Sequence, residues 1–167
     1  SYLLGLGHRH IACISNAQPE YTAAPERVAG FRNALNRMNV PVNEGLIRYA
    51  DFDPESGFEC MNSILRSGEK FTAVFIASDN VAIGAKAAIR EANLRIPEDV
   101  SLVGFDDIPW AKYSDPPLTT IQLPAEALAQ SACTLLLDLI QGNESSENNH
   151  LILETELIIR RSCKALQ

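Results

Sequence analysis

The chain alternates between two kinds of apolar segment. Short, continuous apolar runs bounded by turn residues predict strands that are covered on both faces. These runs lie at residues 10–15, 46–50, 72–77 and 100–105. Between them, apolar residues recur every three or four positions, which predicts helices. The helices are expected at residues 25–38, 53–66 and 81–92.

Residue types at the ends of these segments support the predicted limits. Residues 2–6 have the pattern of a helix end, and Gly7 stops that helix. Pro25 opens the next helix, because proline is favoured in the first helical turn. Asp79 is expected to cap the helix at 81–92, since an aspartate side chain accepts hydrogen bonds from free backbone N–H groups.

Four strands alternating with three helices predict an α/β fold with a parallel, doubly wound sheet. Right-handed crossovers place the loops that follow the strands at one edge of this sheet. These loops are residues 16–27, 50–53, 78–80 and 105–107. In open α/β sheets, ligands bind in the crevice at this edge, so we expect the functional site there.

The C-terminal part has a different character. Residues 118–123 and 151–160 are extended pieces, and a polar loop is expected at 142–149. Between them, Pro124 opens a helix rich in leucine and alanine. This helix has no strand partner of its own, which indicates a piece of something larger or a second lobe that lies elsewhere.

Composition narrows the function classes. With 167 residues, 46% of them hydrophobic, the chain is expected to form one globular domain. A net charge of -7 without a basic run makes these residues a poor candidate for nucleic-acid contact. No apolar run is long enough to cross a bilayer. The four cysteines are scattered, which favours thiols in a reducing compartment over a disulfide framework or a metal site.

Several motifs in order resemble the LacI/GalR family of bacterial transcription regulators. They are LGHRHIA at 6–12, RVAGF at 27–31, ASDNVAIGA at 77–85, IPEDVSLVGFDD at 96–107 and PLTTI at 117–121. The resemblance implies a periplasmic-binding-protein-like effector domain. Residues 1–121 would form its C-terminal lobe. Residues 122–149 would be the crossover helix and loop of the N-terminal lobe, and residues 150–167 a returning strand and tail.

The resemblance also implies a function. The chain would be the ligand-sensing and dimerisation domain of a cytoplasmic repressor that binds a sugar or similar small metabolite. Operator DNA would be bound by a helix-turn-helix, which these residues do not resemble. No cofactor and no catalytic activity are expected. The alternative is a periplasmic sugar-binding transport receptor with the same architecture.

Two charged residues are the main candidates for ligand contact. The resemblance implies that Arg27 contacts the effector, and a guanidinium offers a rigid fork of donors to hydroxyls or a carboxylate. Asp106 is the matching acceptor, because one carboxylate can accept hydrogen bonds from two neighbouring hydroxyls. The structural alternatives are a solvated arginine in a first helical turn and an ordinary loop aspartate.

Further positions are expected around this pair. Phe52 would pack on the apolar face of the ligand, or belong to the core. Ser78 stands where many family members have asparagine, Tyr21 would shape specificity, and Asp79 would contact ligand or only cap its helix. Asp107 is expected to be structural. For the dimer contact, Ile83 and Tyr113 are the candidates.

An enzyme with a metal held by aspartates is a further hypothesis. Its ligands would come from Asp51, Asp79, Asp106 and Asp107. Arg27 in the same crevice argues against it, because a fixed positive charge repels a hard cation. His8 and His10 are interpreted as part of a helix-end motif, since no third ligand is near them in the sequence.

Overall fold

The computed structural model describes residues 1–21, 23–141 and 151–166. The strands are β1 (Ile11–Ser15), β2 (Ile47–Tyr49), β3 (Ala73–Ile76), β4 (Ser101–Asp106), β5 (Thr119–Gln122) and β6 (Glu156–Ile158). The helices are α1 (Tyr2–Gly5), α2 (Ala23–Arg37), α3 (Pro54–Arg66), α4 (Asp79–Glu91), α5 (Pro109–Tyr113) and α6 (Ala125–Ile140), with a 3-10 turn η1 at Glu44–Leu46.

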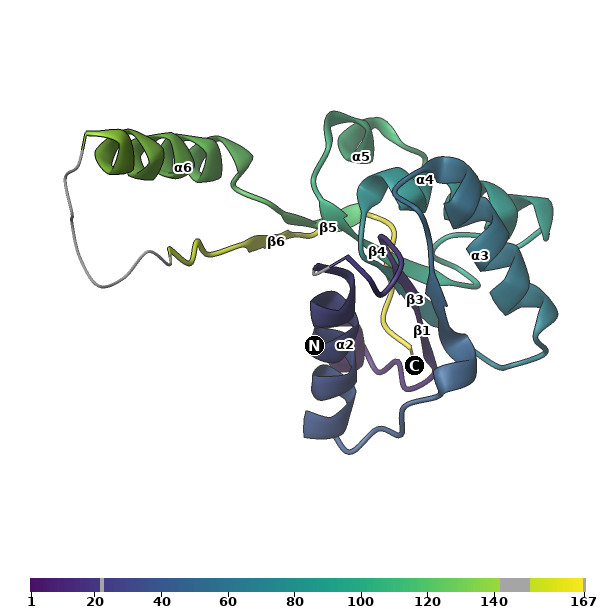
Figure 1. The fold of residues 1–167 in the computed structure, drawn as a ribbon. Helices are drawn as coiled ribbons and strands as arrows, with labels where there is room; N and C mark the ends of the chain where they lie inside the picture. Colours follow the sequence, from purple (N-terminus) through teal and green to yellow (C-terminus); the bar gives the residue numbers. More distant parts are fainter. Residues whose placement is uncertain (22, 142–150, 167) are drawn as a thin grey trace.

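The strands form one six-stranded sheet in the order β2-β1-β3-β4-β5-β6 (Figure 1). The first five strands in this order pair in parallel, and β6 pairs with β5 antiparallel. The expected doubly wound α/β fold is therefore confirmed. The sheet is mixed rather than wholly parallel, because the returning strand runs against its neighbour.

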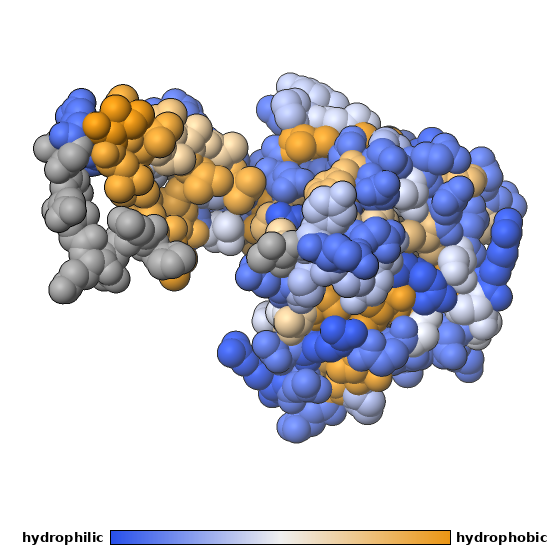
Figure 2. All heavy atoms as spheres, in the orientation of Figure 1, coloured by the Kyte–Doolittle hydropathy of each residue, from blue (hydrophilic) through white to orange (hydrophobic). Residues whose placement is uncertain are grey.

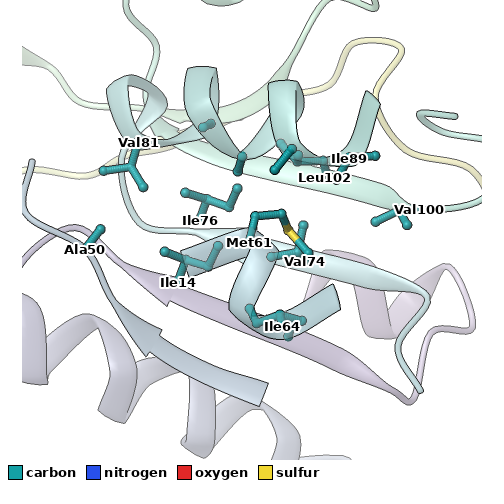
Figure 3. Close-up of a cluster of buried hydrophobic side chains, with 14 of the residues drawn as sticks. Ile14, Ala50, Met61, Ile64, Val74, Ile76, Val81, Ile89, Val100 and Leu102 are labelled. Atoms are coloured by element: carbon teal, nitrogen blue, oxygen red, sulfur yellow. The ribbon is translucent and has the colours of Figure 1, made fainter. Parts of the chain in front are cut away.

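Helices cover both faces of the sheet, and alternate strand residues point to each side. Ile14 and Val74 belong to the core cluster under α3 and α4, whereas Ile11 and Ala73 pack with α1 and α2. Figure 3 shows the first of these layers, where side chains of the sheet face Met61 of α3. The side chain of Met61 has no solvent exposure, so this layer is dry and closely packed.

Close packing of α3 against α4 depends on two glycines that face the partner helix. A Cβ built on Gly84 of α4 would lie 1.6 Å from the carbonyl oxygen of Pro54 in α3. A Cβ built on Gly57 of α3 would lie 2.1 Å from the carbonyl oxygen of Val81 in α4. The two backbones thus approach more closely than any residue with a side chain would permit.

The structure differs from the sequence-based prediction at several helix and strand boundaries. The expectation that Asp79 caps α4 is wrong: Ser78 is the N-cap, its side chain accepts from the backbone N–H of Asn80, and Asp79 is the first helical residue. The second helix starts at Ala23 instead of Pro25. Of the extended piece predicted at 151–160, only Glu156–Ile158 joins the sheet. The polar loop predicted at 142–149 lies outside the described residues.

α6 extends away from the sheet and its flanking helices (Figure 1). None of its residues is buried, and its apolar side chains form an exposed hydrophobic surface (Figure 2). The large exposed side chains on it are Leu128, Leu136, Leu137, Leu139 and Ile140. An exposed apolar helix of this kind normally packs against further protein. Among the described residues, no helix is long and apolar enough to span a membrane.

The C-terminal tail is anchored on β4 and β5. Arg160 forms an ion pair with Asp107 at 2.7 Å, and both side chains are largely buried. The hydroxyl of Ser162 donates to the carbonyl of Leu102 and accepts from the backbone N–H of Thr119. Asp107 therefore has the structural role expected for it.

His8 is a buried packing residue. Its Nδ1 lies 2.8 Å from the hydroxyl of Thr72, and its Nε2 lies 3.1 Å from the carbonyl oxygen of Lys164. Both ring nitrogens are thus occupied by contacts within the fold. Burial lowers the pKa of His8, which favours the neutral ring.

Candidate functional site

The loops after β1, β2, β3 and β4 carry polar and aromatic side chains at the carboxyl edge of the sheet. These strands are parallel, so their carboxyl ends lie at the same edge. We call Tyr21, Arg27, Phe52, Ser78 and Asp106 the carboxyl-edge cluster. Tyr21 contacts Phe52, the charges of Arg27 and Asp106 act on each other, and Asn80 bonds to both Ser78 and Phe52. Each of the five residues was a candidate from the sequence.

Arg27 lies on α2 and reaches across the end of the sheet. Its Nη1 donates to the carbonyl oxygen of Ala77, the residue after β3. Its guanidinium lies over the ring of Phe105 in β4, 4.2 Å from the ring centroid. These two contacts fix the direction of the side chain and use only part of its five-donor capacity. Burial lowers the pKa of Arg27, while the charge of Asp106 raises it.

Asp106 ends β4 and faces the same region. Burial raises the pKa of its carboxyl, and three contacts oppose this change. They are the charge of Arg27, a hydrogen bond from the Ser78 hydroxyl and one from the backbone N–H of Asp79. Within the described part of the chain, the two side chains interact through their charges without forming a direct ion pair. A cation and an anion therefore lie close together, both with unused hydrogen-bonding positions.

Left-handed backbone conformations occur at this edge. The φ angles of Phe52, Asp106 and Asp107 are 61°, 110° and 58°. Such values in residues other than glycine cost about 1–3 kcal/mol each and cluster at functional sites. Here they turn the chain sharply at the ends of β2 and β4 and so aim Phe52 and Asp106.

Phe52 and Tyr21 form an aromatic pair at the outer part of the cluster. Their ring centroids are 5.5 Å apart in an edge-to-face arrangement, and both rings are about half exposed. The main chain of Phe52 is held on both sides: its N–H donates to the carbonyl of Asn16, and its carbonyl accepts from the side chain of Asn80. Phe52 is therefore not a core residue.

Asp79 lies beneath the cluster and has no solvent exposure. One carboxylate oxygen accepts from the hydroxyl of Thr120 at 2.7 Å, and the other accepts from the backbone N–H of Ile108 at 3.1 Å. Burial raises the pKa of this group to about 6. The carboxylate packs directly over Gly104, where an added Cβ would lie 2.0 Å from it.

A pocket of about 450 Å³ lies between α1, α2 and the sheet. Its walls are mainly apolar and include Leu4, Phe31 and Val103. Arg27 and Phe105 also line it, so the guanidinium of the cluster forms part of its wall. Sequence reasoning did not predict this pocket.

The residues suggested for a dimer contact lie on α4 and α5. Ile83 on α4 is half-buried, whereas Tyr113 at the end of α5 is 78% exposed. Trp110 packs locally against the core. The amine of Lys86 lies 5.2 Å from its ring centroid and donates to Ser114 and to the carbonyl of Pro116. Burial lowers the pKa of Lys86 to about 8.

These side chains can hydrogen-bond to a ligand and pack against it. Residues 1–21, 23–141 and 151–166 contain no group of three histidine, cysteine or acidic side chains arranged to hold a metal ion. The cluster offers hydrogen-bond donors from Arg27, acceptors from Asp106 and an exposed ring from Phe52. Such a set suits a small polar molecule with one apolar face.

Open α/β sheets with polar groups at their carboxyl edge form a class of ligand-binding lobes. Residues 1–163 match the model of the periplasmic binding protein-like domain. The chain belongs to this family.

Similar proteins are transcription regulators. The chain is 41% identical over 165 residues to the HTH-type transcriptional repressor PurR of Pasteurella multocida. This match covers 98% of this chain and 48% of that protein. It is 38% identical over 160 residues to the HTH-type transcriptional regulator CelR of Thermobifida fusca. This match covers 96% of this chain and 46% of that protein. The resemblance to LacI/GalR regulators is thus confirmed, and the chain spans about half the length of these relatives.

Solved structures of transcription regulators have the same fold as this chain over nearly its whole length. The complex of the transcriptional regulator CelR with cellobiose matches with a TM-score of 0.91 and 37% identity, over 96% of this chain and 49% of that one. The lac repressor dimer bound to operator and the anti-inducer ONPF matches with a TM-score of 0.90 and 34% identity. This match covers 98% of this chain and 56% of that one.

Proposed function

We propose that this chain is the effector-sensing part of a LacI/GalR-type transcriptional repressor. Its carboxyl-edge cluster would bind a small metabolite such as a sugar. The observation that carries the proposal is the placement of Arg27 and Asp106. They lie 79 residues apart in the sequence, on α2 and at the end of β4, and their charges act on each other at the sheet edge where such lobes bind ligands.

The positions of these side chains support a specific role in ligand binding for each residue of the cluster. Arg27 would donate to ligand oxygens, and Asp106, with Ser78 beside it, would accept from ligand hydroxyls. Phe52 would pack on the apolar face of the ligand, and Tyr21 would limit what fits beside that ring. Asp79 would act indirectly, because its carboxylate has no exposure and both oxygens are already bonded.

The rest of the chain would connect this site to regulation. We propose that residues 122–149 pass to a second lobe, with α6 packing there through its exposed leucines. Residues 150–167 would bring the chain back. Ile83 and Tyr113 would contribute to a homodimer contact. A separate helix-turn-helix would bind the operator in the cytoplasm. An effector would change operator binding only if it binds two states of the dimer with different affinities.

A ligand screen on the whole protein tests this function. Thermal unfolding is followed with a panel of sugars, cellobiose among them, and of nucleobases. A ligand present at 100 times its Kd is expected to add about 2.7 kcal/mol to the free energy of unfolding. Arg27→Ala and Asp106→Ala are each expected to abolish most of this gain, because each removes a charged hydrogen-bonding partner.

Arg95→Ala provides a matched control. Arg95 is exposed and paired with Asp99, before β4 and away from the carboxyl edge, so the response to ligand should persist in this variant. A full response in both Arg27→Ala and Asp106→Ala would remove the cluster from the proposal. If no compound in a broad panel stabilises the protein, the effector-sensing function itself is contradicted.

A further inference from the structure

Asp79 is unusual because it is a fully buried acid with only neutral hydrogen-bond donors. Its partners are the Thr120 hydroxyl on β5 and the Ile108 N–H before α5. Arg27, the cation on α2, acts on the neighbouring Asp106. Asp107 is already paired with Arg160. The remaining charged neighbour is Asp106 itself, which disfavours ionisation of Asp79 because the charges are alike.

This arrangement does not serve stability. A carboxyl whose pKa is raised on folding binds a proton more readily in the folded protein than in the unfolded chain. Asp79 therefore stabilises the fold most when it is protonated, and this contribution is lost as the pH rises through about 6. Buried acids that cost stability at neutral pH are found where a site needs them.

The contacts of Asp79 show what it joins. Its side chain accepts from the N–H of Ile108, the residue before α5 and two residues after Asp106, and the charge of Asp106 acts on the same carboxyl. Its other oxygen holds β5 through Thr120. Gly104 of β4 lies directly under the carboxylate and leaves no room for it to move toward the sheet.

We propose that Asp79 is a positioning residue that couples the carboxyl-edge cluster to α5 through one buried carboxylate. When ionised, it draws the N–H of Ile108 and the hydroxyl of Thr120 toward itself and repels Asp106. When protonated, it loses one acceptor position, so the turn at 106–108 and the start of α5 are held less tightly. The proposal rests on the proposed function only in taking the cluster as the effector site.

The test needs no ligand. In the whole protein labelled with ¹⁵N and ¹³C, the Ile108 amide and the carboxyl carbons of Asp79 and Asp106 are followed by NMR from pH 4.5 to 8. The Ile108 amide is expected to shift with a midpoint near 6, together with the Asp79 carboxyl. In Asp79→Asn this shift of Ile108 should vanish, because the titrating group that faces its N–H is gone.

Two further variants separate positioning from simple structural support. Thr120→Val removes a hydrogen bond that favours the ionised acid, so the Ile108 midpoint should move above that of the parent. This variant keeps the acid, and it serves as the test should Asp79→Asn fail to fold. Asp99→Asn, an exposed acid paired with Arg95, should leave the Ile108 titration unchanged.

Persistence of the Ile108 titration in Asp79→Asn would overturn the proposal. An Ile108 midpoint unaffected by Thr120→Val would overturn it as well. These results do not depend on the ligand screen: a screen without a hit contradicts the effector function and leaves the titrations standing. Where a ligand is found, its affinity should change with pH around 6 in the parent and not in Asp79→Asn.

Discussion

Replacing Gly84 by alanine is expected to destabilise the protein by about 3 kcal/mol, the upper part of the range for overpacked cores. The new Cβ would lie 1.6 Å from the Pro54 carbonyl oxygen and 2.7 Å from the Phe58 backbone nitrogen. Both atoms belong to the first turn of α3, so no side-chain rotation relieves the clash. The two helices must separate, which opens the layer around Met61. Urea unfolding followed by circular dichroism measures the change.

Gly30→Ala is the matched control. Gly30 is an exposed residue inside α2, and a Cβ there meets no atom within 4 Å. Alanine at such a site should stabilise the protein by up to about 1 kcal/mol, because it has the higher helix propensity. Opposite signs for the two variants are expected. If Gly84→Ala were as stable as the parent, the described approach of α3 and α4 would be incorrect.

Replacing Arg160 by methionine is expected to cost about 3 kcal/mol, because breaking a buried ion pair leaves the other charge without a partner. The side chains of Arg160 and Asp107 are only 17% and 10% exposed. Arg160 also donates to the carbonyl of Leu118, and this bond is lost too. Thermal or urea unfolding measures the effect.

The same substitution at an exposed pair calibrates this result. Arg32 and Glu44 are paired at 2.7 Å, but their side chains are 37% and 63% exposed. Arg32→Met should therefore cost less than about 1 kcal/mol. Adding Asp107→Asn to Arg160→Met should recover part of the stability, since the stranded charge is removed. Equal losses in the two single variants would show that the Arg160–Asp107 pair is not buried as described.

Local patterns in the sequence predicted most of the fold. Helical spacing and short apolar runs located α2, α3 and α4 and the first four strands to within a few residues. The topology rules then placed Arg27 and Asp106 at one edge. These predictions succeeded because burial on both faces of a parallel sheet leaves a strong periodic signal.

The errors arose where distant contacts decide the outcome. Both Ser78 and Asp79 are residue types that cap helices. Ser78 takes that position, since its backbone is extended and Asp79 is already helical, while the carboxylate of Asp79 accepts from Thr120, 41 residues away. The packing of this acid on Gly104 and the hold of Asn80 on Phe52 depend on the assembled sheet. No spacing in the sequence carries that information.

The pairing of β5 with β6 determines how α6 is connected to the sheet. The polypeptide leaves the sheet after β5 and returns along β6, the edge strand, which pairs with β5 alone, while β5 also pairs with β4. Because Gln122 of β5 is in register with both Asp106 of β4 and Glu156 of β6, a change in the orientation of α6 would reach the sheet beside Asp106.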